Sequence, residues 1–154
     1  MKIAIIGQGY VGLTISAFAG ASHHVIGFDK NQVIVDQLNN GISHIEGVEN
    51  SVIAGLISQG NYKATTLGSD IKGSDIVVIA VPTPLDSDRQ PDLSYIDAAC
   101  KVIGENLDSP ALIINESTSY PGTIRNYIKP AIEKYSKQKL EHQYAISPER
   151  VDPG

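Results

Sequence analysis

The sequence predicts an α/β fold in which a doubly wound parallel sheet carries helices on both faces. Short apolar runs alternate with stretches of helical spacing along the whole chain, the pattern that produces such sheets. The first apolar run, residues 3–6, leads directly into Gly7-Gln8-Gly9-Tyr10-Val11-Gly12. A second run, residues 24–28, ends at Asp29, about 20 residues after the glycines begin. Strand, glycine-rich turn, helix and acid in this order predict a Rossmann-type unit that binds a dinucleotide.

The three glycines have separate tasks in such a unit. Gly7 allows the tight turn off the strand, Gly9 lets bare backbone approach a pyrophosphate, and Gly12 lets the following helix press against the sheet. The N–H groups that start this helix have no partners within it and lie at its positive dipole end, so they suit a diphosphate. The alternative is a turn that only joins strand to helix, but it leaves the acid after the second strand unexplained.

Asp29 predicts NAD rather than NADP as the dinucleotide. Its carboxylate can accept hydrogen bonds from a ribose hydroxyl, whereas a phosphate there brings two anions together. Two unit charges about 4 Å apart repel by roughly 4 kcal/mol at an effective dielectric near 20. Lys30, directly after the acid, can partly offset this repulsion, although the usual fate of such a lysine is a solvated stem.

Composition narrows the possible partners. The chain of 154 residues is long enough for one domain, and its net charge of −5 comes without the basic stripe that nucleic acid requires. The longest apolar stretch, residues 76–82, is far shorter than the ~20 residues that span a bilayer, and no charged leader precedes the first strand. The adjacent His23 and His24 make a poor metal pair because they point to opposite faces of a strand. We therefore expect a cytoplasmic protein without nucleic-acid, membrane or metal partners.

Periodicity, caps and breakers place the elements in order. The first helix has Val11, Ile15 and Phe18 at helical spacing, so we expect them on its buried face. Asn31 is the candidate cap of the second helix, which Gly41 ends. In chain order we expect strand 2–7, helix 10–21, strand 24–28, helix 31–40, an irregular segment 42–47, helix 48–58, strand 62–66, strand 75–81, helix 93–107, strand 111–115, helix 124–135 and strand 144–146.

Three details of the later elements are unusual. The link between strands 62–66 and 75–81 has about nine residues, fewer than the dozen usual for a parallel crossover. Pro130 should kink or split the last helix. The helix over 93–107 has an apolar face, formed by Ile96, Ala99, Cys100, Ile103 and Leu107. Cys100 is therefore expected to be a buried packing residue rather than a nucleophile.

Polar loops follow the last three strands. In doubly wound sheets, ligands sit outside the carboxyl ends of the strands, where the strand order reverses. We therefore expect the chemistry-bearing residues of these loops to converge on one edge of the sheet. They are Thr83, Ser117, Thr118, Glu149 and Arg150.

Together with the glycine loop, these segments resemble the amino-terminal domain of the UDP-glucose/GDP-mannose dehydrogenase family over essentially the whole chain. The matching residues are Gly7-Gln8-Gly9-Tyr10-Val11-Gly12-Leu13, Asp29, Val81-Pro82-Thr83-Pro84, Glu116-Ser117-Thr118, Pro121-Gly122-Thr123 and Pro148-Glu149. Two stretches are similar to the branch that oxidises UDP-N-acetylglucosamine or UDP-N-acetylmannosamine to uronic acids. They are Pro91-Asp92-Leu93-Ser94-Tyr95, and Ser147-Pro148-Glu149-Arg150 with Asp152-Pro153-Gly154. The UDP-glucose branch is the alternative.

The resemblance implies a set of site residues and a reaction used in polysaccharide biosynthesis. In the family, two hydride transfers to two NAD molecules take a primary alcohol to a carboxylate through a cysteine thioester. Thr118 would lie between nicotinamide and substrate, and Glu149 would act near the sugar C6 as a base or water-positioning group. The implied cofactor contacts are Gly7, Gln8, Gly9, Tyr10, Val11, Gly12, Asp29, Lys30, Thr83 and Thr118.

Relative to this family, the chain stops at Gly154, before the domains that supply the nucleophilic cysteine and hold UDP. We therefore expect residues 1–154 to be the NAD-binding domain of a longer, homodimeric enzyme, able to bind NAD but not to turn over a UDP-sugar. The alternatives are a free-standing NAD-binding regulatory module and a dehydrogenase of the 6-phosphogluconate or 3-hydroxyacyl type. The module gives no reason for Thr118 and Glu149 at the expected catalytic edge, and the other dehydrogenases are not expected to carry Pro-Thr-Pro and Pro-Glu-Arg in these loops.

Overall fold

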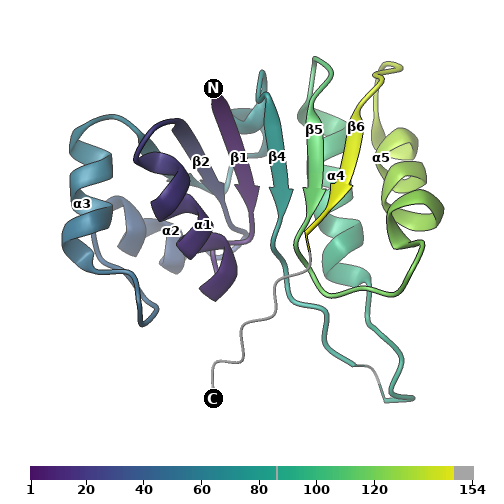
Figure 1. The fold of residues 1–154 in the computed structure, drawn as a ribbon, viewed down its shortest axis with the longest axis horizontal. Helices are drawn as coiled ribbons and strands as arrows, with labels where there is room; N and C mark the ends of the chain where they lie inside the picture. Colours follow the sequence, from purple (N-terminus) through teal and green to yellow (C-terminus); the bar gives the residue numbers. More distant parts are fainter. Residues whose placement is uncertain (86, 148–154) are drawn as a thin grey trace.

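The computed structural model describes residues 1–85 and 87–147. Its elements are β1 (Lys2–Ile6), α1 (Tyr10–Gly20), β2 (His24–Phe28), α2 (Gln32–Asn39), α3 (Asn50–Ser58), β3 (Tyr62–Thr65), the 3₁₀ turn η1 (Gly68–Ile71), β4 (Ile76–Ile79), α4 (Ser94–Asn106), β5 (Leu112–Asn115), the π-helical turn η2 (Ile124–Ile128), α5 (Lys129–Tyr135) and β6 (Gln143–Ile146). The strands form one parallel sheet in the order β3-β2-β1-β4-β5-β6 (Figure 1). The order reverses between β1 and β4, which confirms the doubly wound fold.

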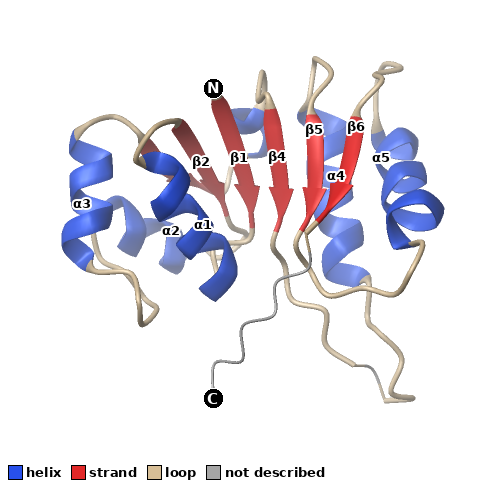
Figure 2. Ribbon diagram, in the orientation of Figure 1, coloured by secondary structure: helices blue, strands red, loops and turns tan. Residues whose placement is uncertain are grey.

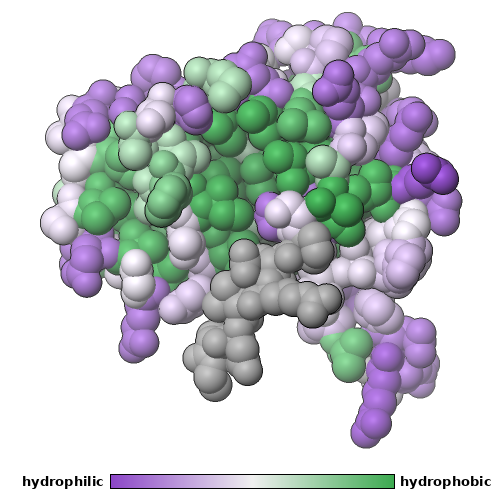
Figure 3. Space-filling model, viewed as in Figure 1, coloured by the Kyte–Doolittle hydropathy of each residue, from purple (hydrophilic) through white to green (hydrophobic). Residues whose placement is uncertain are grey.

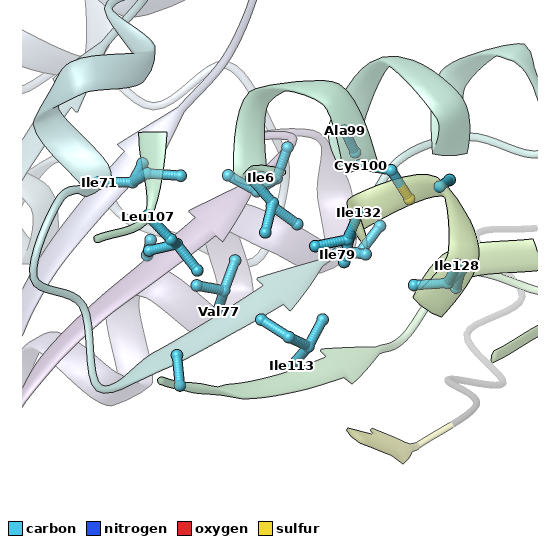
Figure 4. Close-up of a cluster of buried hydrophobic side chains, with 14 of the residues drawn as sticks. Ile6, Ile71, Val77, Ile79, Ala99, Cys100, Leu107, Ile113, Ile128 and Ile132 are labelled. Atoms are coloured by element: carbon cyan, nitrogen blue, oxygen red, sulfur yellow. The ribbon is translucent and has the colours of Figure 1, made fainter. Parts of the chain in front are cut away.

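The helices cover opposite faces of the two halves of the sheet (Figure 2). On one face, α1, α2 and α3 pack over β1, β2 and β3 around Ile5, Leu13 and Leu38. On the other face, α4, α5 and the turns η1 and η2 form the core drawn in Figure 4, where Ile79 and Cys100 lie together. This division follows from right-handed crossovers, because the chain winds outward from β1 in both directions.

The short link between β3 and β4 needs no full helix. Residues 66–75 pass through η1, whose Ile71 is fully buried in the core on the α4 side of the sheet. The link crosses three strand spacings, about 14 Å, whereas ten extended residues can span about 33 Å. A turn that buries one isoleucine is therefore enough to return the chain to the start of β4.

One part of the sheet is left without a helix among the described residues. In Figure 1 no helix lies in front of β4 and β5, and the same region of Figure 3 is apolar. The register places Ile76, Leu112 and Ile114 on the face that carries Ile3 and Ile5, and the first three are only half-buried. We refer to these three side chains as the open sheet face.

The buried side of α1 differs from the expectation. Phe18 is 87% exposed, and Val11 and Ile15 are only half-buried. The buried residues of α1 are Gly12, Leu13, Ser16 and Gly20. A Cβ on Gly12 would overlap the Gly7 carbonyl oxygen at the end of β1, and a Cβ on Gly20 would lie 2.8 Å from a methyl group of Leu56 on α3, so these small residues allow α1 to pack closely. The expectation for Phe18 was therefore wrong.

Two other local predictions are confirmed. The Asn31 side chain caps α2 by accepting a hydrogen bond from the Val33 N–H at 3.0 Å. Pro130 splits the last helix into η2 and α5. Because proline has no N–H and crowds the carbonyl one turn earlier, the chain widens into a π-helical turn just before it.

Candidate functional site

The loop between β1 and α1 is shaped by two close backbone approaches. Gly7 has φ +95°, and its N–H donates to the Phe28 carbonyl oxygen at 2.8 Å. A Cβ on Gly7 would lie 2.5 Å from the Ala80 carbonyl oxygen, and a Cβ on Gly12 would overlap the Gly7 carbonyl oxygen. Around Gly9, in contrast, a Cβ would meet nothing within 4 Å. The protein itself requires the two outer glycines, whereas Gly9 leaves space for a ligand.

The start of α1 fits the pyrophosphate of a dinucleotide. Gly9 is the N-cap residue, and no side chain caps this end of the helix. The N–H groups of the first turn, which includes Tyr10 and Val11, are therefore available to an anion at the positive end of the helix dipole. The open space at Gly9 lies beside them and lets a phosphate come close.

Asp29 is held at the carboxyl end of β2 by two backbone groups. Its Oδ2 accepts a hydrogen bond from the Gln8 N–H at 2.9 Å, and its Oδ1 accepts one from the Asn31 N–H at 2.9 Å. The carboxylate thus links the glycine loop to the start of α2. Each oxygen keeps a further lone pair, so the group can still accept hydrogen bonds from a ribose.

The side chain of Gln8 points into the core rather than into the cleft. It is fully buried, and its Oε1 accepts hydrogen bonds from the Ser16 hydroxyl at 3.0 Å and the Tyr62 hydroxyl at 2.9 Å. Its Nε2 donates to the Ile5 carbonyl oxygen at 3.1 Å. Burial, and then the Asp29 charge, raise the pKa of Tyr62, which keeps it a hydrogen-bond donor. The Gln8 side chain therefore fixes the loop from behind.

Replacing Gln8 with alanine should lower the free energy of unfolding by about 2–5 kcal/mol, because two buried hydroxyls lose their acceptor and a cavity forms. Denaturant unfolding measures this loss. The matched control is Gln138→Ala, since Gln138 is exposed and should change stability by no more than about 0.5 kcal/mol. Equal stability of the two variants would contradict the role assigned to Gln8.

A cavity of about 380 Å³ opens on the Asp29 side of the glycine loop. Asp29 and Lys30 line one wall, and the residues of α4 that line the opposite wall are Tyr95, Ala98, Ala99 and Val102. Most of the lining is apolar, with the acid placed at its rim, as the base and ribose of an adenosine require. Sequence reasoning missed the α4 wall. Tyr95 belongs to a motif that indicated only a family resemblance. The position of Tyr95 in the sequence does not indicate that it lines this cavity.

A second cavity of about 270 Å³ opens on the other side of Gly9. It brings together residues from the glycine loop and from the loops after β4 and β5. They are Gly9, Tyr10, Val11, Ala80, Val81, Pro82, Thr83, Glu116, Ser117 and Thr118. The convergence of Thr83 and Thr118 therefore agrees with the expectation from topology.

Ser117 joins two of these loops. Its buried hydroxyl donates to the Val81 carbonyl oxygen at 2.7 Å and accepts a hydrogen bond from the Val81 N–H at 3.0 Å. This pairing fixes the start of the Thr83 loop against the β5 loop. Thr118, the next residue, remains exposed at the cavity. Ser117 thus has a structural task, whereas the Thr118 hydroxyl is open to a ligand.

The other candidate residues fall outside this geometry. Glu149 and Arg150 lie outside the described residues. Cys100 is fully buried in the core, and burial, followed by the Asp97 charge, raises the pKa of its thiol to about 12. It is therefore a neutral packing residue, as expected.

The part of the chain that the structure describes lacks a metal-binding cluster and a membrane-spanning helix. Residues 1–85 and 87–147 contain no cluster of three or more His, Cys, Asp or Glu side chains that could hold a metal ion. They also form no helix that is long and apolar enough to cross a bilayer.

Known proteins resemble this chain in sequence and in fold. Residues 1–154 match the family described as UDP-glucose/GDP-mannose dehydrogenase family, NAD binding domain. The whole chain is 37% identical to UDP-N-acetyl-D-mannosamine dehydrogenase of Pyrococcus horikoshii, covering 37% of that protein. It is 34% identical to UDP-N-acetyl-D-glucosamine 6-dehydrogenase of Pseudomonas aeruginosa, of which it covers 36%. A crystal structure of GDP-mannose dehydrogenase from Pseudomonas aeruginosa superposes with a TM-score of 0.91 at 31% identity, over 99% of this chain and 37% of that one.

Proposed function

The chain belongs to the UDP-glucose/GDP-mannose dehydrogenase family as its NAD-binding domain, and we propose that it serves a longer nucleotide-sugar 6-dehydrogenase. In this proposal the domain presents NAD to the C6 alcohol of a UDP-N-acetylhexosamine, which is oxidised to a carboxylate. The relatives at 37% and 34% identity bear the names of UDP-N-acetylmannosamine and UDP-N-acetylglucosamine dehydrogenases, which favours an acetamido sugar over UDP-glucose.

The observation that carries the proposal is the pair of cavities on either side of Gly9. Both are lined by Gly9, Ala80, Val81 and Pro82, so they form two ends of one cleft across the start of α1. The apolar end with Asp29 suits the adenosine, and the first-turn N–H groups suit the pyrophosphate. The end with Thr83 and Thr118 is left for the nicotinamide, whose ring accepts a hydride when NAD is bound.

Two residues have distinct proposed roles in the chemical steps of the longer enzyme. The exposed hydroxyl of Thr118 orients the substrate oxygen or a water by a hydrogen bond. Glu149 removes a proton from the water that hydrolyses the thioester in the longer enzyme, a step to which a positioned base contributes about 10²- to 10⁴-fold. The nucleophilic cysteine of that step is not Cys100, because the Cys100 side chain is buried in the core away from both cavities.

The chain spans little more than a third of the length of the relatives described above. We propose that residues 1–154 form one domain of a homodimeric, cytoplasmic enzyme of polysaccharide biosynthesis. This enzyme works without nucleic-acid or membrane partners. The domain by itself binds NAD and does not oxidise a UDP-sugar.

Calorimetric titration of residues 1–154 tests the cofactor part. We expect one NAD to bind, NADP to bind at least tenfold more weakly, and UDP-N-acetylglucosamine not to bind. An absorbance assay with NAD and this UDP-sugar should show no NADH. Absence of NAD binding would overturn the proposal, and NADH production by this chain alone would overturn the need for further domains.

The base assignment is tested in the longer enzyme. Glu149→Gln should slow thioester hydrolysis in single-turnover experiments, whereas Glu141→Gln, at an exposed position before β6, should leave it unchanged. Hydrolysis at the normal rate in Glu149→Gln would show that Glu149 is not the general base.

A further inference from the structure

Lys30 lies at the adenosine end of the cleft with its charge held by an aromatic ring. Its Nζ is 4.5 Å from the centroid of the Tyr95 ring, within the range of a cation–π interaction. Both residues line the cavity of about 380 Å³, Lys30 from the end of β2 and Tyr95 from the first turn of α4. The contact therefore bridges two walls of the adenosine cavity.

The acid next to Lys30 is engaged elsewhere. Asp29 directs its two oxygens at the N–H groups of Gln8 and Asn31, and the ion pairs among the described residues do not include Lys30. The acid and the base that follow each other in sequence thus have separate partners. Asp29 and Lys30 therefore form no ion pair with each other.

We propose that Tyr95 is a specificity-determining residue, which strengthens the choice of NAD over NADP by holding the Lys30 ammonium on the α4 wall. This inference rests on NAD binding as proposed above. A lysine directly after the ribose-binding acid is placed to pair with a 2′-phosphate and to offset its repulsion by Asp29. Such a pairing must first break the contact with Tyr95, and this cost falls on NADP alone.

The contact with Tyr95 also explains how a lysine can stand directly after Asp29 while the site still prefers NAD to NADP. A solvated lysine loses little by turning toward a phosphate, whereas one seated on a ring gives up that contact. Tyr95 does not touch the phosphate in this scheme. It acts through Lys30, and its effect is a change in the ratio of two affinities.

The test is calorimetric titration of residues 1–154 with NAD and with NADP, and the quantity compared is the ratio of the two dissociation constants. We expect Tyr95→Leu to shift this ratio toward NADP by about 2- to 5-fold. Tyr95→Phe should leave the ratio unchanged, because phenylalanine keeps the aromatic face. Both cofactors are titrated against the same sample, so a loss of folded protein or of general packing cancels in the ratio.

Lys30→Met supplies the matched background. Tyr95→Leu introduced into Lys30→Met should leave the ratio where Lys30→Met alone puts it. An unchanged ratio in Tyr95→Leu, or an equal shift with and without Lys30, would overturn the role of Tyr95. If the unmodified chain binds no NAD, the proposed function fails instead, so the two failures are distinguishable.

Discussion

Gly9→Ala is expected to weaken NAD binding by about 100-fold while leaving the fold intact, and Gly12→Ala to lose both binding and stability. At Gly9 the backbone is extended, with φ −72°, and a Cβ meets nothing within 4 Å. The protein without a ligand therefore accommodates alanine at this position. The new methyl group stands where a pyrophosphate must approach. At Gly12 a Cβ would overlap the Gly7 carbonyl oxygen, which should cost about 3 kcal/mol of stability.

The test compares the two variants in stability and in NAD affinity. Thermal unfolding and calorimetric titration with NAD should separate them, since Gly9→Ala keeps its melting temperature and Gly12→Ala does not. Gly55→Ala provides a control, because Gly55 lies within α3 and a Cβ there also meets nothing within 4 Å. Normal NAD affinity in Gly9→Ala would show that the pyrophosphate does not rest at the start of α1.

Asp29→Asn is expected to weaken NAD binding by about 10- to 100-fold and to reduce the discrimination against NADP by at least tenfold. Asparagine removes the charge that repels a 2′-phosphate, a repulsion of roughly 4 kcal/mol at an effective dielectric near 20. Asparagine also has only one acceptor oxygen in place of the two of the carboxylate, so the backbone N–H of Gln8 or of Asn31 loses its acceptor. Hydrogen bonds to charged groups contribute about 1.5–3 kcal/mol each.

Dissociation constants for NAD and NADP from the same titration series check both effects. Asp36→Asn is the control, since Asp36 is an exposed residue on α2 that does not line the cavity. An NAD affinity within twofold of the unmodified chain in Asp29→Asn would contradict the assignment of Asp29 to the ribose.

The sequence predicted the features that single residues impose on the local backbone better than the features that depend on packing between distant segments. The glycine loop, the Asn31 cap and the split at Pro130 follow from backbone conformations that single residues impose, and all three are present. Phe18 was placed wrongly because α1 is apolar around most of its circumference. In such a helix, periodicity does not choose a side, and close approach by Gly12 and Ser16 decides it.

The site shows the same limit. Asp29 and Thr83 could be placed from the rule that ligands bind at the carboxyl ends of parallel strands. Tyr95 could not, because its part in the cavity depends on how α4 crosses the sheet. The inward turn of the Gln8 side chain depends likewise on Tyr62, which belongs to a strand far along the chain.

The open sheet face has a practical consequence for anyone who handles the isolated domain. Because Ile76, Leu112 and Ile114 are only half-buried, we expect molecules of the isolated domain to associate through this face, increasingly so at higher protein concentration. Salts such as sulfate strengthen it, because they are excluded from protein surfaces. Titrations of this chain therefore belong in dilute samples and in chloride rather than sulfate buffers, where self-association through the open sheet face is weakest.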